Sequence, residues 1–350
     1  MQEKIEVGVL GATGMVGQQF ANQLRDHPWF DLTWLGASER SAGKPYAEAT
    51  NWVQDSEMPD GLGGRMVSEA KPDGNAPKLV FSAMDASVAG EIEQAFARAG
   101  HIVVSNSKNH RMDPDVPLLI PEINPEHLGL IETQRKNRGW SGAIVTNPNC
   151  STITMTMGLA PLKPFGIRKV LAATMQAMSG AGYPGLPSMD IVANVIPFIG
   201  GEEDKVETES QKILGTFSNG VIEHLPAAVS AHCNRVQVID GHLACLSIEL
   251  AEKVGVERLI EAMETWRGRP QELELPTAPK QPVHVRAEEN RPQTRRDVMA
   301  EAGMAVSVGR VRECPLLDYK FVVLGHNTIR GAAGAAVLNA ELMKVDGWLD

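Results

Sequence analysis

The sequence is poor in three features that would each point to a particular class of protein. Four cysteines in 350 residues, without paired spacing, make neither a disulfide framework nor a zinc site, so a reducing cytoplasm is the expected setting. The 33 lysines and arginines are outnumbered by 43 aspartates and glutamates, and the net charge of −10 argues against non-specific nucleic-acid binding. No apolar run approaches the roughly 20 residues of a membrane helix. The opening MQEKIEVGVLGATG enters a strand pattern directly, so we expect no signal peptide.

What the first half does have is a regular alternation of strand-like and helix-like stretches. Apolar runs with the length of buried strands lie at residues 4–10, 31–38, 78–84, 101–107 and 142–148. Stretches of helical periodicity lie at residues 15–27 and 86–99. This alternation predicts an α/β fold with a parallel, doubly wound sheet, a Rossmann-type dinucleotide-binding domain over residues 1–149.

The pattern changes after residue 150. Longer and partly alternating strands are expected at residues 169–180, 235–240, 242–252, 305–311 and 319–325, with helices at about 203–214 and 255–266. They predict an α+β domain with a mixed sheet over residues 150–328, serving catalysis and oligomerisation. The small-residue stretch RGAAGAAVLNAELMKV predicts a C-terminal helix, within about 329–350, that returns to the first domain.

Three glycines, Gly11, Gly14 and Gly17, form the turn GATGMVG between the first predicted strand and the first helix. Glycine lets the backbone approach a pyrophosphate, and free N–H groups at a helix start bind it. A tight strand–helix turn without a ligand is the simpler alternative. The position of the turn favours dinucleotide binding.

The end of the second predicted strand refines the choice of dinucleotide. Arg40 offers a guanidinium there, and Ser38 and Ser41 offer hydroxyls, which together suit the 2′-phosphate of NADP. Glu39 leaves room for NAD, because an acidic residue at this place binds the ribose of that cofactor. NADP is the predicted cofactor.

Cys150 is the one cysteine framed by turn residues on one side and a predicted helix on the other, in NPNCSTITM. Amide groups at a helix N-terminus lower the pKa of a thiol, and a thiolate is the stronger nucleophile. A cysteine of this kind directly after a dinucleotide-binding domain predicts hydride transfer through a thiohemiacetal and a thioester. A buried structural cysteine is the alternative, which the polar frame disfavours.

Such chemistry needs a group that moves a proton. His242 follows the stretch RVQVIDG, which predicts a strand that reaches a glycine and then this histidine. Arg235, seven residues earlier, could face the same cleft. Taken alone, a histidine in this position is more often a structural residue than a catalyst.

Eight strings, in order along nearly the whole chain, resemble the aspartate-semialdehyde dehydrogenase family in the branch typical of archaea and fungi. They are GATGMVG, ASERSAGK, SNSKNHRMD, NPNCSTI, QAMSGAGYPG, GEEDKVETESQKIL, RVQVIDGH and HNTIRGAAGAAVLNAEL. The resemblance implies that Cys150 is the acyl-forming nucleophile, that His242 is the acid/base group and that Gln176 orients the substrate or intermediate. It also implies a homodimer or homotetramer.

The resemblance further implies a pocket for an amino acid that carries a phosphate. Arg235 would clamp the α-carboxylate through a bidentate fork, and Glu202 would hold the ammonium group. The phosphate would be bound by Arg111, Asn149 and Lys205. Glu203 competes with Glu202 for the ammonium, and Glu202 with Lys205 could instead be a solvated helical pair. The implied cofactor residues are Gly11, Thr13, Gly14, Met15, Val16, Ser38, Arg40, Ser41, Ser179, Gly180, Asn327 and Thr328.

The implied reaction is the NADPH-dependent reductive dephosphorylation of L-aspartyl 4-phosphate to L-aspartate 4-semialdehyde, on the route to lysine, threonine and methionine. A malonyl-CoA reductase of the same fold is the nearest alternative, and Asn149 with the EEDK segment disfavours it. An N-acetyl-glutamyl-phosphate reductase is more distant in chemistry. A third alternative is a non-catalytic NADP-sensing protein, in which Cys150 has no role. No metal is expected.

Overall fold

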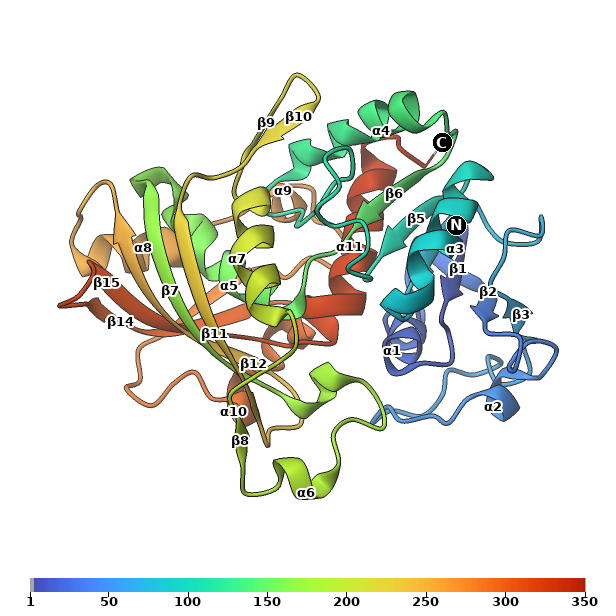
Figure 1. The fold of residues 1–350 in the computed structure, drawn as a ribbon, viewed down its shortest axis with the longest axis horizontal. Helices are drawn as coiled ribbons and strands as arrows, with labels where there is room; N and C mark the ends of the chain where they lie inside the picture. The colour runs from blue at the N-terminus through green and yellow to red at the C-terminus, as the bar shows by residue number, and fades with distance from the viewer. Residues whose placement is uncertain (1–2, 350) are drawn as a thin grey trace.

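The computed structural model describes residues 3–349 as two adjoining α/β units, each built around one sheet (Figure 1). The first sheet has six parallel strands in the spatial order β3-β2-β1-β4-β5-β6. Their bounds are β1 Ile5–Leu10, β2 Phe30–Ala37, β3 Ser68–Glu69, β4 Leu79–Ser82, β5 Ile102–Ser105 and β6 Ala143–Thr146. The predicted doubly wound sheet is confirmed.

Strand β1 lies inside this sheet, between β2 and β4. The chain moves outward through β2 and β3 and then crosses over β1 to begin the other half at β4. Such a reversal of strand order opens a crevice at the carboxyl ends of the strands, and this is where α/β sheets bind their ligands. The turn GATGMVG leaves β1 at this edge.

Helix α1, Met15–Gln23, begins directly after that turn. Gly11 has a φ of +74°, and a Cβ at this residue would lie 2.6 Å from the carbonyl oxygen of Ala83. A Cβ at Gly17 would lie 2.3 Å from the carbonyl oxygen of Gly11. Glycine is therefore required at both positions for α1 to pack this close to the sheet. Helix α1 ends before the predicted residue 27, because Asp26 takes a positive φ of 54°.

The second sheet has seven strands in the order β13-β14-β15-β12-β7-β11-β8. Strands β7 and β11 pair in parallel, as do β13 and β14, and the remaining pairs are antiparallel, so the predicted mixed sheet is confirmed. The bounds are β7 Ile167–Gln176, β8 Val195–Ile196, β11 Ala228–Val236, β12 His242–Leu250, β13 Val283–Arg286, β14 Val306–Glu313 and β15 Tyr319–Gly325.

One face of this sheet is covered by the helices α5, Cys150–Leu159, α7, Glu202–Ile213, and α8, Val256–Thr265. Helices α7 and α8 confirm the two that the sequence predicts. Along each strand, residues that point to the covered face alternate with residues that point to the opposite face. On β7, for example, Val170 and Ala172 are buried, Leu171 is exposed and Ala173 is half-buried.

The strand predicted at residues 235–240 is wrong beyond residue 236. Strand β11 ends at Val236, so Arg235 lies at its carboxyl end, and His242 begins the next strand, β12. Between them the carbonyl oxygens of Val238 and Ile239 accept hydrogen bonds from residues 178 and 179, just after β7. Residues 237–240 of the alternating RVQVID therefore lie outside the sheet, and hydrogen bonds to the segment after β7 satisfy part of their backbone.

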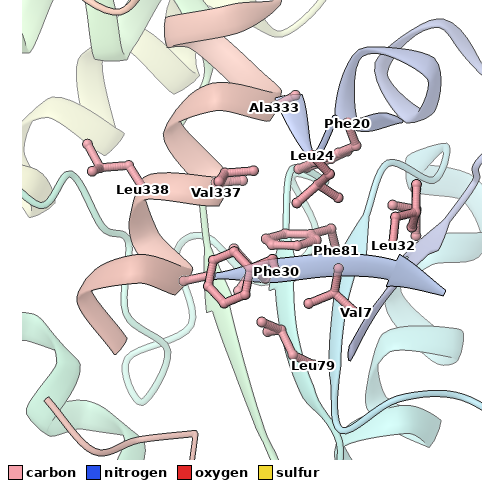
Figure 2. Packing of buried hydrophobic residues seen from close by; sticks show 14 of the residues in the cluster. Val7, Phe20, Leu24, Phe30, Leu32, Leu79, Phe81, Ala333, Val337 and Leu338 are labelled. Carbon is pink, nitrogen blue, oxygen red and sulfur yellow. The ribbon is translucent and has the colours of Figure 1, made fainter. Parts of the chain in front are cut away.

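The C-terminal segment begins with a π-helical turn, Ile329–Ala333, and continues as α11, Gly334–Val345. Figure 2 shows Val337 of this segment on the side of Phe30 and Phe81 of the first sheet, whereas Leu338 points to the other side of the helix, and both belong to the core of the first unit. Ala335 of the same segment joins the core of the second unit, and Figure 1 shows α11 between the two sheets. The division of the chain at residue 149 stays a prediction.

The remaining elements are α2 Tyr46–Ala49, α3 Ala86–Arg98, α4 Leu130–Arg138, α6 Ser188–Ile191, β9 Thr216–Ser218, β10 Val221–Glu223, α9 Arg269–Glu272 and α10 Thr294–Asp297, with 3₁₀ turns at Pro125–Gly129, Ala160–Phe165, Met178–Ala181 and Ala300–Gly303. Among them, α3 and α4 pack on the first sheet, and the others are short. Within residues 3–349, no helix combines the length and the apolar character that crossing a bilayer requires.

Candidate active site

A cavity of about 440 Å³ lies where the carboxyl edge of the first sheet meets the second unit. Its walls come from the turns after β1, β4, β5 and β6, from the segment after β7, from the start of α7 and from the segment that follows β15. The predicted site residues that line it are Met15, Val16, Arg111, Asn149, Cys150, Ser179, Gly180, Glu202, Lys205, Arg235, Asn327 and Thr328. The fold thus brings 12 of the 20 predicted site residues around one space.

Cys150 is the first residue of α5, and Asn149 caps this helix. The Oδ1 atom of Asn149 accepts hydrogen bonds from the N–H groups of Ser151, at 2.9 Å, and Thr152, at 3.1 Å. This cap explains why NPNC precedes the helix, because it satisfies amides that have no partner inside α5. On the other side, a Cβ at Gly331 would lie 2.7 Å from the Cβ of Cys150.

The predicted lowering of the pKa of Cys150 is wrong for this structure. Burial raises the pKa of the thiol to about 12, and the nearby Glu202 carboxylate adds to the rise. Arg111, Arg235 and the N–H of Ser151 act in the opposite direction without reversing it. A helix N-terminus contributes only about 0.3–1 kcal/mol in an ordinary setting. Desolvation outweighs it, so the resting sulfur is a neutral thiol.

His242 is buried, and its ring is held by the backbone at the end of β7. Its Nδ1 accepts a hydrogen bond of 3.1 Å from the N–H of Ala177, which places the proton of the neutral ring on Nε2. Within the described part of the chain, Nε2 has no hydrogen-bond partner. Burial, followed by the charge of Arg235, lowers the pKa of His242 to about 3. The resting ring is therefore neutral and carries an unused donor.

Arg235 and Gln176 lie opposite each other on the neighbouring strands β11 and β7. Arg235 donates from Nη1 to the carbonyl oxygen of Ala177 at 2.7 Å. Gln176 is buried, donates to Thr174 and does not line the cavity. A Cβ at Gly180 would lie 2.7 Å from Nη1 of Arg235 and 3.0 Å from Nε2 of His242. Arg235 lines the cavity and His242 does not, and a side chain at residue 180 would collide with both, so glycine is needed beside them.

Glu202 and Glu203, the two candidates to bind the ammonium group, are the first residues of α7 and have different partners. Glu202 accepts hydrogen bonds from Nδ2 of Asn149, at 2.8 Å, and from Nζ of Lys205, at 3.0 Å. Burial alone would raise the pKa of Glu202, but Lys205 and Asn149 bring it below its usual range. Glu203 instead accepts from the N–H of Cys233 on β11. Glu202 and Lys205 are thus part of the cavity wall, and Glu203 is not.

Arg111 reaches the cavity from the loop after β5, and the structure adds a partner that the sequence did not reveal. Its Nη1 donates to Oε1 of the buried Glu209 at 2.9 Å, and its Nη2 donates to the carbonyl oxygen of Asn106 at 2.7 Å. Glu209 is seven residues after Glu202 on α7, so helical spacing places it on the same face. This spacing was the available signal for Glu209.

The predicted cofactor residues fall into three groups. Met15 and Val16 line the cavity, and Gly11, Thr13 and Gly14 lie in the turn just before them. Asn327 donates to Oγ of Ser179 at 2.7 Å and accepts from the N–H of Gly241 at 2.8 Å, so it ties the turn before His242 to the cavity wall. Ser38, Arg40 and Ser41 follow β2 outside this cavity, at the same sheet edge, and Arg40 is exposed.

Comparisons with known proteins agree with this geometry. Residues 6–131 match the protein-family model described as "Semialdehyde dehydrogenase, NAD binding domain", and residues 159–330 match "Semialdehyde dehydrogenase, dimerisation domain". The aspartate-semialdehyde dehydrogenase of Methanothermobacter thermautotrophicus is 52% identical over 97% of this chain and 99% of its own. The chain belongs to the aspartate-semialdehyde dehydrogenase family.

Two further members of this family support the resemblance to the archaeal and fungal branch. The enzyme named aspartate-semialdehyde dehydrogenase from Schizosaccharomyces pombe is 47% identical over 96% of this chain and 97% of its own. A crystal structure of the Candida albicans aspartate-semialdehyde dehydrogenase with NADP is 44% identical, covers 99% of both chains and has a TM-score of 0.91. The fold is thus that of this family throughout.

Proposed function

We propose that this protein is the NADP-dependent, phosphorylating aspartate-semialdehyde dehydrogenase of lysine, threonine and methionine biosynthesis. The observation that carries the proposal is the position of Cys150 at the start of α5, in one cavity with the start of α1 and with three basic side chains, Arg111, Lys205 and Arg235. A nucleophile between a dinucleotide turn and an anion site is what reductive removal of a phosphate needs.

The glycine turn fits a dinucleotide. A Cβ at Gly11 would collide with the backbone of Ala83, and the amides of the first turn of α1 have no partner inside that helix. Met15 and Val16 place this turn on the cavity wall. The exposed guanidinium of Arg40, at the same sheet edge, supports NADP over NAD, because it can neutralise a 2′-phosphate.

The charges of the cavity fit L-aspartyl 4-phosphate. We assign the α-carboxylate to Arg235, the ammonium group to Glu202, and the phosphate to Arg111, Lys205 and Asn149. The support for this assignment is that all five side chains line one cavity, with Glu202 as a carboxylate whose pKa lies below its usual range. Malonyl-CoA carries no ammonium group, so the Glu202 carboxylate would have no partner in that substrate.

In the proposed reaction, the sulfur of Cys150 attacks carbon 4 of the substrate. A C–S bond forms, the bond from carbon 4 to the phosphate oxygen breaks, and the thiol proton passes to the departing phosphate, which the basic side chains bind. His242 is the acid/base group, and its Nε2 proton is directed to the oxygen on carbon 4, where negative charge develops. Gln176 orients the intermediate from beside Arg235. When bound, NADPH supplies the hydride that reduces the thioester and releases the semialdehyde.

One experiment tests the proposal against its alternatives. The protein is mixed with L-aspartate 4-semialdehyde, NADP and either phosphate or coenzyme A, and NADPH absorbance is followed. Phosphate-dependent reduction of NADP is the expected result. Dependence on coenzyme A would indicate a malonyl-CoA reductase, and NADP binding without turnover would indicate a non-catalytic NADP sensor. Cys150→Ala should abolish turnover and leave NADP binding intact, so retained turnover would refute the assignment of the nucleophile.

We also propose that the protein is a cytoplasmic homodimer or homotetramer. The match to a dimerisation domain supports self-association. The face of the second sheet opposite α5, α7 and α8 is a suitable surface for self-association, because it exposes Leu171 on β7 and Cys245 on β12. Light scattering of the purified protein distinguishes a dimer from a tetramer. Four free cysteines support the reducing setting.

A further inference from the structure

Glu209 connects the side chain of Arg111 to the backbone that precedes Cys150. One carboxylate oxygen, Oε1, accepts from Nη1 of Arg111 at 2.9 Å, and the other, Oε2, accepts from the N–H of Asn149 at 2.7 Å. Glu209 is 2% exposed and does not line the cavity. Its two oxygens are therefore committed to two donors of the site and are not offered to a ligand.

These contacts belong to one continuous chain of hydrogen bonds. Arg111 binds Glu209, Glu209 binds Asn149, Asn149 donates to Glu202, and Glu202 accepts from Lys205. The two proposed phosphate-binding cations therefore stand at the two ends of a network that passes through the cap of the helix of Cys150. Glu209 is the only side chain of this network that we have not placed in contact with the substrate.

A second residue of α7 fixes the backbone of the Arg111 loop. Nζ of the buried Lys212 donates to the carbonyl oxygens of Arg111, Asp113 and Val116, at 2.7, 2.8 and 2.8 Å. Lys212 lies three residues after Glu209 and so on the same face of α7. Lys212 thus anchors the main chain of Arg111, while Glu209 anchors its guanidinium.

We propose that Glu209 is a positioning residue that sets the guanidinium of Arg111 at a fixed place relative to the sulfur of Cys150. The role rests on the proposed function, since it matters to catalysis only if Arg111 receives the phosphate that leaves carbon 4. A charge-assisted hydrogen bond on each side makes the bridge stiff. Without the bridge, Arg111 and the cap of α5 are held by separate parts of the structure.

The chemistry of the bridge distinguishes a carboxylate from an amide. Both partners of Glu209 are N–H donors, so both side-chain oxygens must accept. Glutamine has the same shape but one acceptor oxygen, and its NH₂ group would face a donor. Glu209→Gln must therefore lose one of the two contacts. Loss of a hydrogen bond to a charged group corresponds to about a tenfold change in binding.

The test measures the Michaelis constants for phosphate, semialdehyde and NADP in the oxidative direction. For Glu209→Gln we expect the constant for phosphate to rise about tenfold and the constant for NADP to stay the same. Glu207→Gln is the matched control, because Glu207 lies on the same helix and accepts from the N–H of Ala231 on β11. It removes the same charge from α7, but its remaining oxygen can still accept the single N–H, so it controls for the loss of charge without affecting Arg111.

Equal losses in Glu209→Gln and Glu207→Gln, or an unchanged constant for phosphate, would overturn the proposal. Glu209→Asp serves if the glutamine variant folds poorly. It keeps the charge but shortens the bridge, and we expect a smaller rise in the same constant. A drop in melting temperature with unchanged constants in that variant would leave Glu209 a merely structural residue and would equally overturn the proposal.

A second measurement keeps this proposal separate from the proposed function. Iodoacetamide alkylation of the Cys150 peptide, followed by mass spectrometry, needs no turnover. Inorganic phosphate should slow this alkylation, and Glu209→Gln should need about ten times more phosphate for the same protection. If the wild type reduces no NADP yet shows this difference, the proposed reaction fails and the positioning role stands. Equal protection of both proteins would reject the positioning role.

Discussion

The state of the Cys150 sulfur can be tested by the pH dependence of its alkylation. Burial raises the pKa of this thiol from 9.0 to about 12, a rise that corresponds to about 4 kcal/mol. At pH 8 an ordinary thiol is ionised in about one molecule in ten, and a thiol of pKa 12 in about one in 10⁴. A more basic thiolate is also more nucleophilic, by about 15- to 30-fold for three pK units. The net expectation is alkylation about 30- to 60-fold slower than that of an ordinary thiol.

The assay is the rate of iodoacetamide labelling of the Cys150 peptide between pH 6 and pH 10, with N-acetylcysteine as the reference thiol. Because the pKa lies above this range, the logarithm of the rate should rise by about one unit per pH unit without a plateau. Circular dichroism at each pH shows that the fold is retained. A plateau near neutral pH would mean that the helix N-terminus lowers the pKa of Cys150 by more than burial raises it, and would refute the raised pKa.

Substitutions on α7 and β11 separate the causes of the raised pKa of Cys150. Glu202 raises the pKa of Cys150, so Glu202→Gln should lower the pKa and speed alkylation at pH 8. Arg235 acts in the opposite direction, so Arg235→Met should slow alkylation. Glu203→Gln is the matched control, because Glu203 binds the backbone of β11 and should leave the rate unchanged. An equal effect of Glu202→Gln and Glu203→Gln would mean that the charge beside the sulfur does not set its pKa.

Three further changes have defined outcomes. Arg330 makes two hydrogen bonds of 2.7 Å to Glu122, and both side chains are fully buried. Arg330→Met should therefore lower the free energy of unfolding, measured in urea, by about 3–5 kcal/mol. The double variant with Glu122→Leu should recover most of this loss. A Cβ at residue 331 would lie 2.7 Å from that of Cys150, so Gly331→Ala should lower kcat more than tenfold with NADP affinity unchanged in a fluorescence titration. Arg40→Ala should raise the Michaelis constant for NADP about tenfold and leave that for NAD unchanged, and equal effects on both cofactors would remove Arg40 from the 2′-phosphate site.

Much of the fold could be predicted because its signals are local. The run of buried strands, the glycine turn and the NPNC cap each depend on residues a few positions apart, and the structure contains all three. The same local reasoning failed for residues 237–240. Their alternation continues that of the strand, but the structure places them outside it, where residues 178 and 179, 60 positions earlier, donate hydrogen bonds to their backbone.

The choice between Glu202 and Glu203 shows where sequence reasoning about the site ends. Adjacent residues on a helix point about 100° apart, and either glutamate could face the ligand until the orientation of α7 on β11 is known. The packing of α7 turns Glu203 toward the backbone of Cys233 and Glu202 toward Asn149. The role of Glu209 likewise depends on tertiary packing, since its partner Arg111 is 98 positions earlier in the chain.

The sequence by itself determined the two sheets, the family of the chain and the residue types from which its site is built. The tertiary structure alone decided which of these side chains meet and what charge they carry. A strand, a cap or a turn depends on its neighbours in the chain. The pKa of Cys150 depends instead on how much water the surrounding segments exclude and on Glu202, Arg111 and Arg235, which reach the sulfur from three distant parts of the chain.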